Sequence, residues 1–217
     1  PATPTPTVSA TSTSTPSVTA TPTGTATPTA TPTPTPAAVC DPTPDAGCRA
    51  PGSPRGSTLV VKDRTPDQRD LLTWRWARGD ATLKTHFGNP VTATAYVLCV
   101  YDRSAGVPML EFTADLPAGG TCGGRPCWRE TKRGFKYVDQ QGTAGGLRSV
   151  VLKEGLQGAA QITLRAIGLA LDTPSLPFEQ DAAVTVLLKN DLGTCWSANY
   201  GTPARSNDDG EFQDTSD

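Results

Sequence analysis

The chain has 217 residues, with 19 lysines and arginines against 21 aspartates and glutamates, which gives a net charge of −2. This near-neutral balance offers no electrostatic reason to bind nucleic acid or an anionic membrane, and no apolar run approaches the roughly 18–20 residues that span a bilayer. Every charged residue lies after position 39, so we expect an uncharged arm over 1–39 and one domain over 40–217.

The arm contains only Thr, Pro, Ala, Ser, Val and one Gly. Prolines remove backbone donors and hold the preceding residues extended, so we expect a solvated, polyproline-II-like rod. A Thr/Ser/Pro composition is typical of O-glycosylated stalks; an unmodified flexible linker is the alternative. The threonines expected to carry O-glycans are Thr3, Thr5, Thr7, Thr21, Thr23, Thr27, Thr29, Thr31, Thr33 and Thr35.

The residues after the arm show the period-two pattern of β-strands. Leu72, Trp74 and Trp76 alternate with other residues, which places all three on one face. In chain order, the expected strands are 59–62, 72–78, 95–101, two strands within 128–139, then 147–152, 160–167, 183–188 and 195–200. Eight or nine short strands without crossover helices favour an all-β fold, a disulfide-stabilised antiparallel β-sandwich.

Six cysteines form an even set in a chain with one histidine, and their spacings match no zinc template. We therefore expect disulfides and, with them, an oxidising location outside the cytoplasm. The strand layout predicts the pairs Cys40–Cys48, Cys122–Cys127 and Cys99–Cys195. The last pair closes a loop of roughly 100 residues, which contributes about 4–5 kcal/mol in the chain-entropy model. Six cysteines permit 15 pairings, so other connectivities stay open.

No catalytic residue, metal site or cofactor is predicted. His86 is the only imidazole, and the Gly-x-Ser-x-Gly elbow, the phosphate-binding patterns and the dinucleotide fingerprint are all absent. We interpret His86 as a surface histidine near a strand end. Acid–base chemistry by two carboxylates has no spacing rule and stays open.

Two acidic segments raise the question of calcium. Asn207–Glu211 offers oxygen ligands and a turn glycine, and Asp63, Asp67 and Asp70 cluster between the first two expected strands. Neither segment matches the twelve-residue calcium loop. Solvated turns are therefore the favoured interpretation, with a structural calcium ion as the alternative.

Four tryptophans raise the question of carbohydrate binding, because exposed aromatic rings stack on sugar faces. Trp128 and Trp196 each follow a cysteine directly, and tryptophans packed on disulfides occur in the cores of β-sandwiches. Trp74 and Trp76 share a face with Leu72, which is typical of a core face. We predict that all four are core residues.

Several motifs resemble those of an uncharacterised module of secreted bacterial proteins. They are Cys48-Arg49-Ala50-Pro51, 59–63 with 70–76, 96–102, Cys127-Trp128, 134–139 and Cys195-Trp196, and the resemblance covers the chain from about Cys40 to its end. It implies a secreted β-module, with no activity or catalytic residue to carry over. The arm separately resembles the linkers of bacterial extracellular proteins.

These features lead us to expect a non-enzymatic extracellular or cell-surface protein that serves in display or in a fibre-like assembly through its arm. The chain opens on Pro1, so we take it as a mature product or a fragment whose export signal was removed. The expected partners are further copies of the chain or matrix polysaccharide, together with covalent O-glycans on the arm. The alternative is a carbohydrate-binding module tethered to a separate catalytic domain, and a hydrolase is third.

Overall fold

The computed structural model describes residues 1–4 and 38–217. The conformation expected for the arm therefore falls almost entirely outside the described residues. The chain divides into two units, Pro1–Pro34 and Thr35–Asp217, and the second unit is an all-β, antiparallel sandwich, as the strand pattern predicted.

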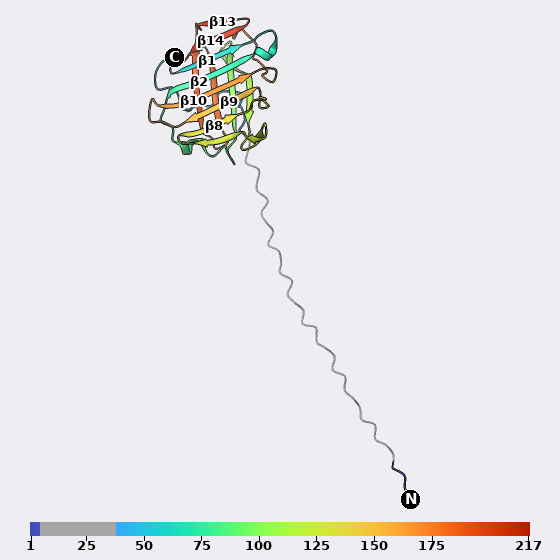
Figure 1. Cartoon of the computed structure of the whole chain (residues 1–217). Helices are drawn as coiled ribbons and strands as arrows, with labels where there is room; N and C mark the ends of the chain where they lie inside the picture. Colours follow the sequence, from blue (N-terminus) through green and yellow to red (C-terminus); the bar gives the residue numbers. More distant parts are fainter. Residues whose placement is uncertain (5–37) are drawn as a thin grey trace. The chain divides into compact units, whose positions relative to one another are not determined.

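The larger sheet has eight antiparallel strands in the order β13-β14-β1-β2-β10-β9-β8-β7. Their bounds are β1 Ser57–Lys62, β2 Leu71–Gly79, β7 Trp128–Thr131, β8 Gly134–Val138, β9 Leu147–Lys153, β10 Ala160–Ile167, β13 Ser206–Asp208 and β14 Glu211–Thr215. This sheet faces the viewer in Figure 1.

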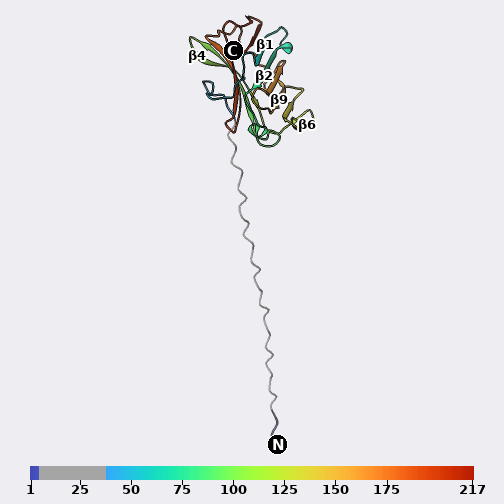
Figure 2. The same ribbon diagram turned by 90° about the vertical axis from the view of Figure 1, so that its left-hand side faces the viewer.

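The smaller sheet has four antiparallel strands in the order β12-β11-β3-β4, whose strands cross behind the larger sheet in Figure 1. Their bounds are β3 Tyr96–Ser104, β4 Val107–Leu116, β11 Ala183–Asn190 and β12 Cys195–Gly201. Figure 2 shows the two layers from the side, with β1, β2 and β9 in one and β4 in the other.

Three short features complete the described part of the unit. A two-stranded hairpin joins β5 (Thr121–Cys122) to β6 (Arg125–Pro126). Two single 3₁₀ turns, η1 (Asp67–Arg69) and η2 (Lys84–Phe87), connect strands of the sandwich. Each turn has only three or four residues, so neither provides a helical layer that could cover a sheet.

The main core lies between the sheets and is built by the period-two alternation of their strands. Leu72, Trp74 and Trp76 of β2 are all fully buried, which confirms the prediction that they share the inner face. The aromatic side chains buried there are Trp128, Trp196, Tyr96, Tyr137, Tyr200, Phe87, Phe112, Phe135, Phe178 and Phe212, in addition to the two tryptophans of β2. Burying a large apolar side chain stabilises a fold by roughly 1.5–3 kcal/mol, so this layer dominates the stability of the sandwich.

Three strands of the two main sheets, β4, β13 and β14, were not predicted from the sequence, and neither was the short β5–β6 pair. β4 carries a proline at 108, and its register against β3 shifts between Val100 and Tyr101, so the alternation of its side chains is interrupted. β13 and β14 are short and polar, and within β14 Phe212 is the only large apolar side chain that packs in the core. Because sheet pairing rather than side-chain pattern holds these strands, the sequence carried little signal for them.

Candidate functional site

All six cysteines form disulfides, but only one of the three predicted pairs is correct. Cys122–Cys127 closes the β5–β6 hairpin as expected, with a Cα–Cα distance of 4.9 Å. The predicted pairs Cys40–Cys48 and Cys99–Cys195 are wrong, because the bonds join Cys40 to Cys99 and Cys48 to Cys195.

The order of the strands explains this correction. β11 lies between β3, which carries Cys99, and β12, which carries Cys195. Strands two positions apart are separated by about 9–10 Å, whereas a disulfide needs Cα atoms within about 7 Å. Cys99 and Cys195 therefore cannot reach each other across β11, and each bonds instead to a residue of the segment that precedes β1.

That segment, residues 38–49, is called the N-terminal anchor below. Its apolar part packs on the outer face of the smaller sheet, where Ala38 joins Val97, Cys99, Tyr101 and Leu187 in a second buried cluster. This explains why β3 has buried residues on both of its faces: Tyr96, Leu98 and Val100 enter the main core, while the alternate residues lie under the anchor.

Polar contacts fix the anchor to the same sheet. The Lys189 Nζ atom pairs with Asp41 and lies 3.0 Å from Asp45 Oδ2, and the Tyr101 hydroxyl donates to the Asp41 carbonyl at 2.8 Å. Arg49 continues the sheet beside β12, since its N–H donates to the Cys195 carbonyl at 3.0 Å and its carbonyl accepts from Ser197. The anchor thus covers both a face and an edge of the smaller sheet.

The charges of the anchor reinforce each other. Hydrogen bonding to the Lys189 ammonium lowers the pKa of Asp41 below its ordinary value. Burial alone would lower the pKa of Lys189, but hydrogen bonds to Asp41 and Asp45 outweigh burial and raise it. Both shifts favour the charged forms, so the pair stays ionised over the whole neutral range.

All four tryptophans are core residues, as predicted. Each indole N–H has a partner inside the protein: Trp74 donates to the Tyr200 hydroxyl, Trp76 to the Ser197 carbonyl, Trp128 to the Pro117 carbonyl and Trp196 to the Thr82 hydroxyl. None is more than 1% exposed. A sugar-stacking platform built from these tryptophans is therefore ruled out.

His86 lies half-buried in η2. Its Nδ1 atom lies 3.1 Å from both the Leu83 N–H and the Arg49 guanidinium, and both donate to it. Burial, and then the charge of Arg49, lower the pKa of His86. The neutral ring therefore ties η2 to the anchor, which is a structural role.

The acidic segments use their oxygens within the protein. Asp70 accepts from the Arg64 N–H and the Thr173 hydroxyl, and Asn207 both accepts from and donates to the backbone of Phe178. Asp208 accepts from the Gly210 N–H in the β13–β14 turn. Over residues 1–4 and 38–217, no three His, Cys, Asp or Glu side chains come together as a metal site would require.

Two hollows lie beside the β5–β6 hairpin and on the adjoining sheet. One of about 830 Å³ is lined by residues that include Arg125, Arg129 and Gln140. An open one of about 490 Å³ is lined by Gln140, Arg148, Ser149, Arg165 and Ile167. Sequence reasoning identified neither hollow, because the pairing of β9 with β10 is what brings Arg148 and Arg165 together.

Most of the threonines expected to carry O-glycans lie outside the described residues. Thr3 is exposed, and the other nine threonines, from Thr5 to Thr35, lie outside the described residues. None of the short helical turns in the described ranges is long and apolar enough to cross a membrane.

No protein-family model, curated protein or solved structure matches this chain. The resemblance to a module of secreted bacterial proteins therefore stays an expectation from the motifs.

Proposed function

We propose that the protein is a non-enzymatic, extracellular structural protein whose domain is carried on an O-glycosylated Thr/Pro arm and associates with further copies of itself. The observation that carries this proposal is the N-terminal anchor. Cys40, near the start of the anchor, is bonded directly to the middle of β3, and eight residues later Cys48 is bonded to β12. Such a double attachment suits a junction that has to hold under load.

The cysteine chemistry supports a location outside the cytoplasm. All six cysteines of the chain are in disulfides, two of which join residues more than 50 positions apart in sequence. Bonds of this kind persist in oxidising compartments and are rare where thiols are kept reduced. They also leave no cysteine to serve as a nucleophile, and His86 is engaged in structural hydrogen bonds.

The outer strand of the smaller sheet supports self-association. β4 pairs with β3 on one side and with no strand of the described residues on the other. At its hairpin end, Val107 and Met109 are 62% and 50% exposed, with Leu110 beside them. Pro108 lacks an N–H, which limits ladder pairing there, so we propose that copies meet through this apolar end.

The test is to express the full chain with secretion in a host capable of O-glycosylation. Intact mass should exceed that of the bare chain by whole sugar units, and sedimentation with electron microscopy should show assemblies. The double variant Val107→Lys/Met109→Lys should be monomeric. The control Leu156→Lys/Leu169→Lys changes two leucines elsewhere that are even more exposed, at 79% and 68%, and it should still assemble.

Two outcomes count against the proposal. A mass equal to that of the bare chain would contradict the glycosylated arm. Wild-type protein that stays monomeric at high concentration would contradict self-association, and equal disruption by both double variants would remove the assignment to β4.

A further inference from the structure

The outer face of the larger sheet is strongly basic over five neighbouring strands, β2, β10, β9, β8 and β7. Outward-facing positions on these strands carry six lysines and arginines and no aspartate or glutamate. This set, called the basic face, is Arg75, Arg129, Lys136, Arg148, Lys153 and Arg165. The net charge of −2 gives no sign of the basic face, because acidic residues elsewhere in the chain balance its positive charge.

The sheet register brings these charges together. Arg75, Thr163, Val151, Lys136 and Arg129 form one continuous row across the five strands. Lys136 and Arg129 stand directly opposite each other, an arrangement of like charges that destabilises a sheet. Adjacent strands lie about 4.7–4.9 Å apart, so the row extends over about 19–20 Å.

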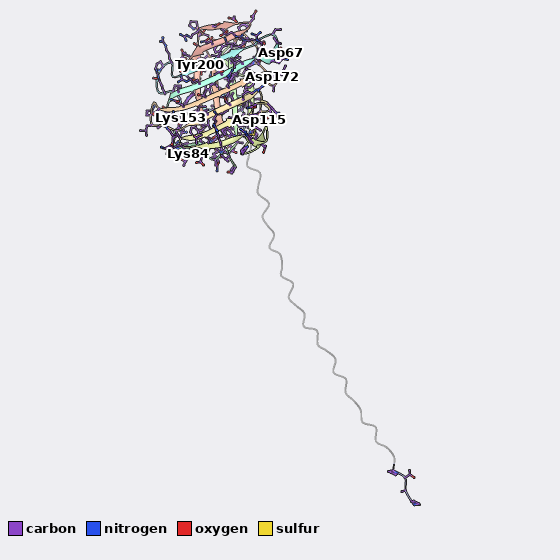
Figure 3. The ribbon with its side chains drawn as sticks, in the orientation of Figure 1. Asp67, Lys84, Asp115, Lys153, Asp172 and Tyr200 are labelled. Carbon is purple, nitrogen blue, oxygen red and sulfur yellow. A yellow bond between two sulfur atoms is a disulfide. The ribbon has the colours of Figure 1, made fainter. Side chains whose placement is uncertain are left out.

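The basic face is not neutralised from within the protein. Salt bridges among the described residues join Lys62 to Glu211, Lys84 to Glu130, and Lys189 to Asp41 and Asp45. None involves the basic face. Figure 3 places Lys153 at one end of this sheet and the acidic residues Asp67 and Asp172 at the opposite end.

The two hollows lie next to the basic face and are lined in part by basic side chains. They share Gln140, and between them they are lined by Arg125, Arg129, Arg148 and Arg165 without a single acidic side chain. The Nε atom of Arg148 is buried and has no hydrogen-bond partner among the described residues. The described part of the protein therefore supplies no acceptor for this donor of the Arg148 guanidinium.

The rest of the face indicates which polyanion fits. The outward positions of the five strands hold no aromatic side chain on which a nucleic-acid base or a neutral sugar ring would stack. Instead, Thr73, Thr163, Ser149 and Gln161 intersperse hydroxyl and amide groups among the charges. Guanidinium groups bind carboxylate and sulfate oxygens in forked pairs, and hydroxyls and amides hydrogen-bond to sugar hydroxyls.

We propose that the basic face binds an anionic polysaccharide, a linear polymer whose carboxylate or sulfate groups pair with its arginines and lysines. The polymer lies along the row from Arg75 to Arg129, with anionic groups in the two hollows. This binding goes beyond the proposed structural function and depends on neither the arm nor the exposed end of β4.

The test measures binding of the oxidised full chain to four immobilised probes at two ionic strengths. Polygalacturonate supplies carboxylates, dextran sulfate supplies sulfates, dextran is the neutral control, and a DNA oligonucleotide, single-stranded or duplex, is the competing polyanion. The face variant is Arg75→Gln/Arg129→Gln/Arg165→Gln, three exposed arginines. Its matched control is Arg55→Gln/Arg64→Gln/Arg69→Gln, three exposed arginines off the face that give the same change in net charge.

Wild-type protein should bind at least one anionic polysaccharide and not dextran, with affinity that falls as salt rises. The face variant should lose about tenfold or more in affinity, as expected when three charge-assisted contacts are removed, while the control variant binds as wild type. The better of the two probes then identifies carboxylate or sulfate as the preferred group.

Three results would overturn the inference: no binding to either anionic polysaccharide, equal losses in the face and control variants, or tighter binding to DNA than to both polysaccharides. The last result would assign the face to nucleic acid. These binding measurements do not depend on assembly or on glycosylation of the arm. A negative binding result would therefore leave the proposed structural function untouched, and a monomeric or unglycosylated protein would leave the polysaccharide inference untouched.

Discussion

At the scale of single residues, Tyr200 closes a hydrogen-bonded chain through the middle of the core. Trp74 Nε1 donates to the Tyr200 hydroxyl at 2.9 Å, the hydroxyl lies 2.6 Å from Ser57 Oγ, and Ser57 donates to the Arg75 carbonyl. Tyr200 itself is fully buried. One hydroxyl therefore satisfies polar groups of β1 and β2 from a strand of the other sheet.

Replacing Tyr200 with phenylalanine should lower the free energy of unfolding by about 1–3 kcal/mol, because the Trp74 N–H and the Ser57 hydroxyl lose a buried partner. Chemical denaturation followed by tryptophan fluorescence measures the change. Tyr101→Phe is the matched control: its hydroxyl serves only the carbonyl of Asp41, in a part-buried contact, so its loss should be smaller. Equal losses in both variants would contradict the role given to the network.

Asp139 organises the loop after β8. Its carboxylate accepts from the Gln141 N–H at 2.9 Å and from the Thr143 N–H at 2.7 Å, and also from the Thr143 hydroxyl. Burial alone would raise the pKa of Asp139, but these hydrogen bonds outweigh it and hold the pKa below its ordinary value of 3.8. The ionised form therefore stabilises the fold.

Asp139→Asn should accordingly cost about 1–3 kcal/mol of unfolding free energy at neutral pH. A carboxylate with a depressed pKa contributes its stability above the unfolded value and loses it as pH falls through the folded value. The gap between wild type and variant should thus be constant above pH 3.8 and close below it. Asp115→Asn, at an exposed position of β4, should show little change at any pH.

At the scale of elements, the turn between β7 and β8 depends on Gly134. Its φ is 148°, and a Cβ atom built there would lie 2.0 Å from the Leu152 carbonyl oxygen of β9. The backbones of β8 and β9 approach too closely for any side chain, so glycine is needed to keep the two strands in register. This closeness depends on the neighbouring strand and not on the turn itself.

Gly134→Ala should therefore destabilise the domain by about 3 kcal/mol or more, since the clash is with backbone that cannot rotate away. Gly124→Ala is the control: it also has a positive φ, 80°, but no atom within 4 Å of the added Cβ. Only conformational strain of about 1 kcal/mol is expected there. Thermal unfolding of both variants provides the comparison.

β3 shows how much of an element its own sequence predicts. The run of apolar residues from Tyr96 to Tyr101 correctly indicates a strand. A continuous apolar run is typical of a strand that is buried on both faces, but nothing in this run identifies what covers the second face. The N-terminal anchor supplies that cover from residues about 50–60 positions earlier, which no local pattern reports.

At the scale of the whole molecule, the disulfides set how force crosses the domain. A pull applied through the arm at Cys40 passes along eight residues to Cys48, crosses the bond to Cys195, and leaves along the 22 residues to Asp217. The 146 residues between Cys48 and Cys195 are thus shielded from tension. This path follows from the connectivity of the bonds.

Force spectroscopy between the two termini should show this shielding. At about 3.6 Å per residue, the oxidised domain should lengthen by at most about 110 Å, and the fully reduced domain by about 640 Å. Cys48→Ser/Cys195→Ser should raise the oxidised value to about 420 Å, because the path then runs from Cys99 to the C-terminus. Cys122→Ser/Cys127→Ser lies off the path and should leave it unchanged; an increase there would contradict the assigned route.

The whole fold also decides where the charged side chains gather on the surface. The near-neutral total offered no electrostatic reason to bind nucleic acid or an anionic membrane, yet the strand register gathers six basic side chains on one sheet face. The net charge of a chain does not say where on the surface its charged side chains lie. The period-two alternation gives each strand one outward-facing set of residues, and only the order of the strands decides whether the sets of neighbouring strands carry the same sign.

The amino-acid sequence by itself determined the class of fold, most of the strands and the identity of the core. Leu72, Trp74 and Trp76 could be placed correctly because alternation and burial are local properties that each strand carries in its own residues. The closed hairpin of Cys122 and Cys127 was predictable for the same reason, since only five positions separate the two cysteines.

Tertiary structure alone decided the other two disulfides, the cover over β3 and the basic face. Each depends on which strands become neighbours, and that order is set by the packing of the whole domain. The insertion of β11 between β3 and β12 keeps Cys99 from Cys195, and the pairing of β2 with β10 brings Arg75 into one row with Lys136 and Arg129. Contacts between residues distant in sequence arise from the summed burial of many side chains, so no single segment encodes them.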